Sequence, residues 1–161
     1  MKTIVADTSP IIALARIGKL ELLRALFGVV LIPDAVYHEL TVAGRPGADE
    51  VQRSDFLRRV SIQQPPALGR MSAALSRADN EALCLAKQEN AAAILGDDSV
   101  LIREATNLSL PIITTRNLLL QAKKQGLLAS VKQAMDDMRR SGVGIPDVLY
   151  FDTLQKAGET Q

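Results

Sequence analysis

The chain has 161 residues, of which 47% are hydrophobic and 23% charged; this excludes a disordered protein and suffices to bury a core. The formal net charge of +1 excludes a global attraction to nucleic acid, so such binding would need local groups of Lys and Arg. Aromatic residues make up only 3%, with no Trp, which disfavours a platform for stacking bases.

Along the chain, short apolar runs alternate with helical patterns. We predict strands at residues 3–6, 29–32, 60–62, 91–95 and 111–114. We predict helices at residues 11–16, 20–27, 35–42, 50–59, 76–90, 98–106, 118–126, 129–140 and 147–155. Pro and Gly residues mark a loop at 44–49 and a connection within the domain at 63–69. This alternation is typical of an α/β fold with right-handed crossovers and a parallel sheet covered on both faces.

We expect a single domain over residues 1–161, located in the cytoplasm. The one cysteine, Cys84, excludes an internal disulfide and is typical of a reducing compartment. The apolar run at the start is too short for a signal peptide. No stretch of the chain is long and apolar enough to span a bilayer, so we expect no membrane segment.

Acidic residues follow two of the predicted strands. Asp7 comes directly after the first strand, and Asp97 and Asp98 come directly after the strand that ends at residue 95. Ligands bind beyond the carboxyl ends of parallel strands, so these carboxylates share one crevice if the two strands are neighbours. Taken singly, each Asp also fits the alternative role of a helix N-cap. A cap needs one carboxylate, however, and two such places at one edge favour a binding site.

Three further acids lie on predicted helices, where their side chains have more than one possible role. Glu39 flanks the apolar stripe of its helix and points either to the sheet edge or to water. Glu81 lies in the first turn of a helix, where a negative charge also complements the helix dipole. Asp79 fits best as the partner of Ser76 in a capping box.

A cluster of carboxylates predicts a hard divalent metal ion. Repulsion among the acids is offset by bound Mg²⁺ or Mn²⁺, which prefer oxygen ligands. His38 is the only histidine, so neither a zinc site nor a histidine relay is available. With no evident Ser or Cys nucleophile, water activated by a metal ion is the simplest chemistry.

Several segments together resemble PIN-domain proteins, in particular their prokaryotic VapC-like subgroup. They are DTSP from Asp7, IPDAVYHEL through Glu39, DNEALCLA around Glu81, AILGDDSVLIREA around Asp97 and Asp98, and LPIITTRNLLLQAKKQGLL. The resemblance covers nearly the whole chain. It rests on the order of the acids rather than on any one motif.

The resemblance implies a three-layer α/β/α PIN-like fold with a central parallel sheet of about five strands. It implies a metal-dependent endoribonuclease, acting on RNA and often forming the toxin of a toxin–antitoxin pair, with a homodimer and an antitoxin protein as partners. The catalytic and metal-binding acids would be Asp7, Glu39, Glu81 and Asp98, with Asp97 as the alternative to Asp98. Glu81 departs from the commoner Asp at its position.

Basic residues in loops and at helix starts are candidate contacts to phosphate. They are Arg45, Arg70, Arg77 and Arg116. For each of them, a solvated surface arginine is the competing interpretation. A rival function is a PIN scaffold that serves as a catalytically weak binding or regulatory module.

Overall fold

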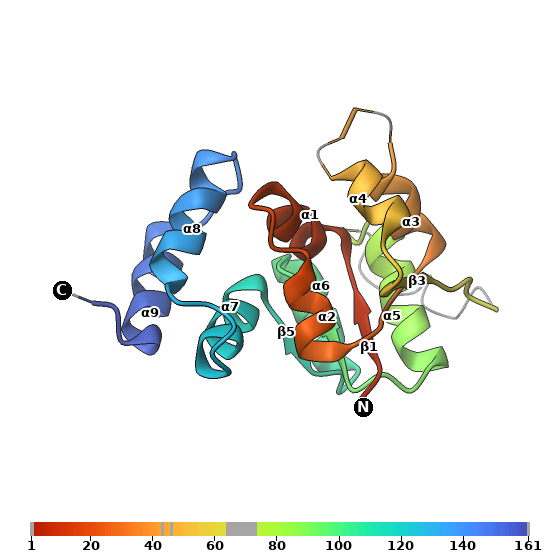
Figure 1. Cartoon of the computed structure of the whole chain (residues 1–161). Helices are drawn as coiled ribbons and strands as arrows, with labels where there is room; N and C mark the ends of the chain where they lie inside the picture. The colour runs from red at the N-terminus through yellow and green to blue at the C-terminus, as the bar shows by residue number, and fades with distance from the viewer. Residues whose placement is uncertain (1, 43, 46, 64–73, 161) are drawn as a thin grey trace.

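The computed structural model describes residues 2–42, 44–45, 47–63 and 74–160. Within them, five short strands form one parallel sheet (Figure 1). The strands are β1 (Ile4–Ala6), β2 (Val30–Ile32), β3 (Leu57–Arg59), β4 (Ala93–Leu95) and β5 (Ile112–Ile113). Their order in the sheet is β3-β2-β1-β4-β5, so β1 is central. The α/β/α architecture with a parallel sheet is therefore confirmed.

Helices connect the strands and cover both faces of the sheet. They are α1 (Thr8–Arg16), α2 (Glu21–Phe27), α3 (Asp34–Leu40), α4 (Ala48–Arg53), α5 (Arg77–Gln88), α6 (Ser99–Asn107), α7 (Thr115–Lys124), α8 (Val131–Arg140) and α9 (Asp147–Ala157). None of these helices combines the length and the apolar character needed to cross a bilayer in the described part of the chain.

The alternation of side chains along β1 divides the core into two apolar layers. Ile4 and Ala6 pack with α1, α2 and the C-terminal helices, whereas Val5 packs with α5 and α6. All three residues are buried, because a central parallel strand is covered on both faces. Continuous apolar runs, rather than alternating ones, therefore mark the inner strands.

The predicted elements around β3 are wrong. The charged helix expected over 50–59 ends at Arg53, and the strand expected over 60–62 lies at Leu57–Arg59. The Ser54 hydroxyl accepts a hydrogen bond from the Leu57 N–H, which stops the helix. This edge strand exposes Arg58 and Arg59, so its pattern resembles a polar helix more than a buried strand. The ends of the other elements shift by at most three residues.

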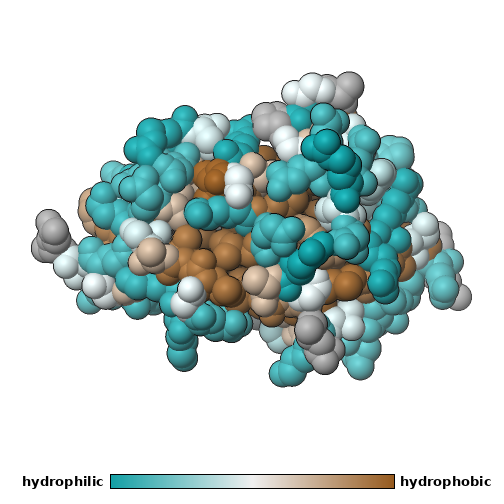
Figure 2. Space-filling model, viewed as in Figure 1, coloured by the Kyte–Doolittle hydropathy of each residue, from teal (hydrophilic) through white to brown (hydrophobic). Residues whose placement is uncertain are grey.

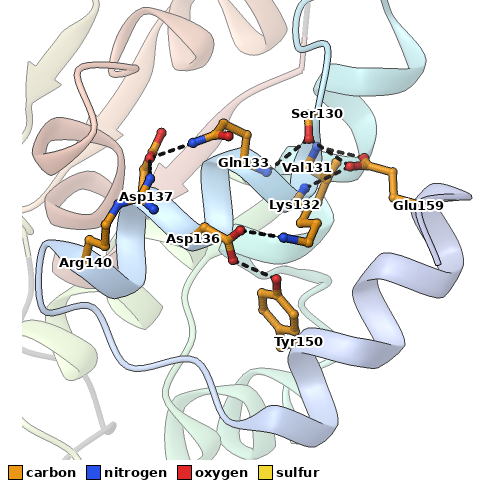
Figure 3. A network of polar contacts seen from close by, with 9 residues as sticks. All are labelled: Ser130, Val131, Lys132, Gln133, Asp136, Asp137, Arg140, Tyr150 and Glu159. Carbon is orange, nitrogen blue, oxygen red and sulfur yellow. Dashed lines mark hydrogen bonds and ion pairs between the residues drawn. The ribbon is translucent and has the colours of Figure 1, made fainter. Parts of the chain in front are cut away.

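Helices α8 and α9 form a pair that packs against α7 and α1 (Figure 1). Figure 3 shows the polar contacts that hold this pair together. The Glu159 carboxylate accepts hydrogen bonds from the Ser130 hydroxyl and from the Val131 and Lys132 N–H groups at the start of α8. Further along, the Tyr150 hydroxyl donates to Asp136 at 2.7 Å. The last helix is thus fixed at two points along α8.

Candidate metal site

Asp7 stands at the carboxyl end of the central strand and is 4% exposed. Its N–H donates to the Leu95 carbonyl at 2.9 Å, which joins it to the end of β4. It occupies the N-cap position of α1, but its side chain makes no capping bond. Among the described residues, its Oδ1 atom is buried without any hydrogen-bond partner. A buried carboxylate oxygen without a partner is costly and indicates a role other than capping.

Two other acids crowd Asp7. The pKa of Asp7 is raised to about 7, mainly by burial and then by the charge and hydrogen bond of Asp79 and the charge of Glu39. The Thr8 N–H opposes them by lowering this pKa. The three carboxyl groups come from the end of β1, from α3 and from α5, and Asp79 is itself buried. At neutral pH this group therefore holds a proton that a cation can replace.

Glu39 is an exposed residue, and one of its carboxylate oxygens reaches the sheet edge. The Thr8 hydroxyl in the first turn of α1 donates to Glu39 Oε2 at 2.7 Å. Glu39 therefore meets both the sheet edge and water, the two directions that the helical pattern left open. Thr8 thus joins α3 to the residue that follows Asp7.

Asp79 plays two roles, of which only one was expected. It completes the capping box with Ser76, as the sequence predicts. It also reaches Asp7, a contact that was not predicted from the sequence. The signal was present: Asp79 precedes the fully buried Ala82, Leu83 and Ala86 by three, four and seven residues, so it lies on the buried stripe of α5.

Glu81 is bound at both carboxylate oxygens. Oε1 accepts the Ala35 N–H at 3.0 Å, and Oε2 accepts Arg77 Nε at 2.9 Å. Ala35 lies in the first turn of α3, whose N-cap residue Pro33 makes no side-chain cap. Glu81 therefore supplies the cap of α3 from a neighbouring helix.

The adjacent acids after β4 have different partners. Asp98 Oδ2 accepts the N–H groups of Val100 and Leu101, so Asp98 is the N-cap of α6. Asp97 accepts the N–H and the hydroxyl of Thr115 at 2.7 and 2.6 Å, which ties the end of β4 to the start of α7. Ala6 and Leu95 are paired in register, so Asp7 and both of these acids follow neighbouring strand ends.

A family model described as a PIN domain matches residues 3–159. The chain belongs to the PIN-domain family. Members of this family are generally nucleases and typically use divalent metal ions. A PilT N-terminus domain protein from the hyperthermophilic archaeon Sulfolobus solfataricus has a similar fold, with a TM-score of 0.57 and 17% identity. The alignment covers 74% of this chain and 92% of that one. A search of curated proteins finds no significant match.

The chemistry of the acids in this PIN domain fits a hard divalent ion. The three carboxyl groups offer only oxygen ligands, and Asp7 Oδ1 has no protein partner within the described residues. Among the residues that the structure describes, no group of three His, Cys, Asp or Glu side chains is arranged to share one metal ion. The group of Asp7, Asp79 and Glu39 therefore has the right donor type, and its side chains would adjust on binding.

Basic side chains flank the acids of the PIN domain. A cavity of about 370 Å³ beside Glu39 is lined by Arg59, Arg77 and His38. Arg59 is held in place because its Nε donates to Asp34 at 2.6 Å and its guanidinium lies 4.6 Å from the centre of the Tyr37 ring.

The predicted phosphate contacts fall in different places. Arg77 lines the cavity beside Glu39, and Arg116 lines a second cavity beside Asp97. Arg45 lies apart from both, in a depression beside α4. Arg70 falls outside the described residues. Arg59 was not among the predicted contacts, because its local sequence pattern resembles a charged helix rather than the edge strand β3.

Proposed function

We propose that the chain is a metal-dependent endoribonuclease in which Asp7, Asp79 and Glu39 hold a Mg²⁺ or Mn²⁺ ion. The observation that carries this proposal is the buried Asp7 carboxyl, which has an unpartnered oxygen and a pKa raised to about 7 by burial and by two neighbouring acids. When bound, the ion would supply a water of lowered pKa and a counter-charge for the phosphate.

The remaining acids support this group in two ways. Asp98 caps α6 through Oδ2 alone, so its Oδ1 atom is available as a further ligand. The alternative is that Asp97, rather than Asp98, is this further metal ligand. Glu81, with both oxygens bound, holds α3 and Arg77 beside the acids and acts as a positioning residue. Arg77 and Arg59 are placed to contact a phosphate that approaches Glu39.

RNA as substrate, and a role as the toxin of a toxin–antitoxin pair, rest on the resemblance of the acidic motifs to VapC-like proteins. A homodimer and an antitoxin protein are the partners that we propose. Two features support a protein partner. Val148 and Phe151 on α9 are 80% and 61% exposed. Figure 2 also shows hydrophobic side chains gathered in the middle of the viewed face, within a hydrophilic border.

The test is cleavage of a mixed-sequence single-stranded RNA with Mn²⁺, with Mg²⁺ or with EDTA. We expect cleavage only with a metal ion, and its loss in the Asp7→Asn, Asp79→Asn and Glu39→Gln variants. Asn retains the capping ability of Asp79, so a loss there reports on the site rather than on the helix. Asp152→Asn, at a half-exposed carboxylate paired with Lys156, is the matched control and should cleave normally. Cleavage in EDTA, or by purified Asp7→Asn protein, would contradict the proposal.

One observation favours a binding or regulatory module as the second candidate. Glu81, Asp97 and Asp98 each hold the start of a helix, and no ligand triad is formed in advance among the described residues. RNA binding measured by fluorescence anisotropy, without cleavage under any metal condition, would support this candidate over the nuclease.

A further inference from the structure

A cavity of about 500 Å³ lies between the carboxyl end of β4 and the segment that joins α8 to α9. Its polar wall contains Ser9, Ser99 and Arg116, at the starts of α1, α6 and α7. In the described structure, the two hydroxyls and the guanidinium form no hydrogen bond or ion pair with other residues. These groups are therefore available to a ligand.

The opposite wall of the cavity is apolar. Val143, Ile145, Pro146 and Leu149 line it, from the α8–α9 connection and the first turn of α9. Leu149 is 37% exposed, so part of its side chain is open to a ligand in the cavity. An apolar face opposite a few separate polar groups is the usual arrangement of a small-ligand site, and the volume falls in the usual range of about 300–1,000 Å³.

The apolar wall is held rigidly in place. Arg139 on α8 donates to the Ile145 carbonyl at 2.5 Å and pairs with Asp147 at 3.0 Å. Its guanidinium also lies 4.0 Å from the centre of the Tyr150 ring. These contacts fix the α8–α9 connection, so the cavity exists before any ligand enters.

We propose that this cavity receives one unstacked nucleobase of the RNA, with Arg116 on the adjoining phosphate. This inference rests on the proposed nuclease function and adds a subsite that selects a base. Ser9 is two residues from Asp7, and Asp98 lines the same cavity, so the next nucleotide along a strand bound at the acids reaches it.

The composition of the chain explains the form of this subsite. Sequence-specific recognition of RNA relies on bases turned out of the strand and packed on aromatic rings or guanidinium planes. Because aromatic residues make up only 3% of the chain, aliphatic side chains must supply the surface against which the base packs. The Ser9 and Ser99 hydroxyls both donate and accept, and they would read the edge of the base.

The experiment is a nuclear magnetic resonance titration of the protein in EDTA with the four ribonucleoside 5′-monophosphates and with ribose 5-phosphate. We expect shifts of the Val143, Ile145 and Leu149 methyl signals for the nucleotides, with one base bound most tightly. Ribose 5-phosphate should shift only signals near Arg116. Equal effects of ribose 5-phosphate and all nucleotides, or nucleotide shifts on another surface, would overturn the proposal.

Gly144→Phe should fill the cavity and weaken nucleotide binding at least about tenfold. Gly144 lines the cavity, its φ is not positive, and a Cβ added there meets nothing within 4 Å, so the backbone tolerates a side chain. Leu127→Phe, at an exposed leucine outside the cavity, is the control and should bind normally. A folded Gly144→Phe protein with unchanged binding would overturn the proposal. If this variant does not fold, Leu149→Ala replaces it and should weaken binding in the same direction.

The charge of Arg116 is tested separately. Arg116→Ala should weaken the binding of every nucleotide and of ribose 5-phosphate alike, whereas Arg103→Ala on the exposed face of α6 should not.

Cleavage data then separate this inference from the nuclease function. Metal-dependent cleavage with the same products in wild type and Gly144→Phe would overturn the subsite and leave the nuclease intact. Base-selective binding without cleavage would support the subsite and contradict the nuclease.

Discussion

Asp7→Asn should remove a pH dependence of stability that the native chain carries. The pKa of Asp7 rises from 3.8 to about 7 on folding, first because of burial and then because of Asp79 and Glu39. Between these two pH values the folded state keeps a proton that the unfolded chain loses. The free energy of unfolding therefore falls as pH rises from about 4 to about 7, and this contribution is constant above pH 7.

The size of the stability change follows from the pKa shift of Asp7. About three pKa units correspond to roughly 4 kcal/mol of stability lost by pH 8. Asn cannot ionise, so the variant should be more stable than the wild type by an amount of this order at pH 8 and nearly equal to it at pH 4. For a chain of this length the difference corresponds to roughly 10 °C in Tm.

The measurement is urea and thermal unfolding, followed by circular dichroism between pH 4 and pH 8.5 in EDTA. Asp152→Asn is the control, because this half-exposed carboxylate on α9 pairs with Lys156 and lies on a surface helix. Its stability should follow that of the wild type across the whole range. Parallel pH curves for wild type and Asp7→Asn would refute the reasoning, since they would mean that Asp7 ionises equally easily in the folded and unfolded chain.

The other predictions concern metal binding, the C-terminal helices and association. Mn²⁺ at about 100 times its Kd should stabilise the wild type by roughly 2.7 kcal/mol at pH 8, and Asp7→Asn should lose this gain; an unchanged Tm would count against the site. Burial raises the pKa of Glu159, but Lys123, Val131, Lys132 and Ser130 outweigh it and lower the pKa to about 2. Glu159→Gln should therefore cost on the order of 3 kcal/mol near neutral pH, and the cost should vanish as pH falls from about 4.5 to 2; Glu89→Gln is the control. Val148→Glu with Phe151→Glu should convert a dimer to a monomer in light scattering, and a monomeric wild type would remove the dimer.

The layers of the fold were predictable because each inner strand is a short apolar run between helical patterns. Residues 4–6 and 93–95 show this clearly, since both faces of these strands are covered. The edge strand was not predictable in the same way. Arg58 and Arg59 face solvent, and the local pattern contains only one buried residue, Leu57. The position of β3 depends on its pairing with β2, which is a contact between distant parts of the chain.

The sequence predicts that acids gather at one edge of the sheet. It does not predict which carboxylates face one another there. Asp7 lies at the edge because it follows a strand end, whereas the helical pattern left the direction of Glu39 open and its contact with Thr8 comes from the packing of α3 beside α1. Helical periodicity places Asp79 on the buried stripe of α5, but the partners of Asp79 and Glu81 depend on how α5 packs against β1 and α3, which periodicity does not give. The choice between Asp97 and Asp98 depends on hydrogen bonds to α6 and α7, of which only the bonds within α6 are local.

The central position of β1 has a consequence for synthesis on the ribosome. Ile4 pairs with Ala93, so one side of this strand has no partner until most of the chain has left the exit tunnel. At ordinary translation rates that interval is on the order of ten seconds. Asp79 also arrives late, and until then Asp7 remains hydrated with an unshifted carboxyl. A nascent chain therefore lacks the assembled carboxylate group until α5 and β4 have left the ribosome.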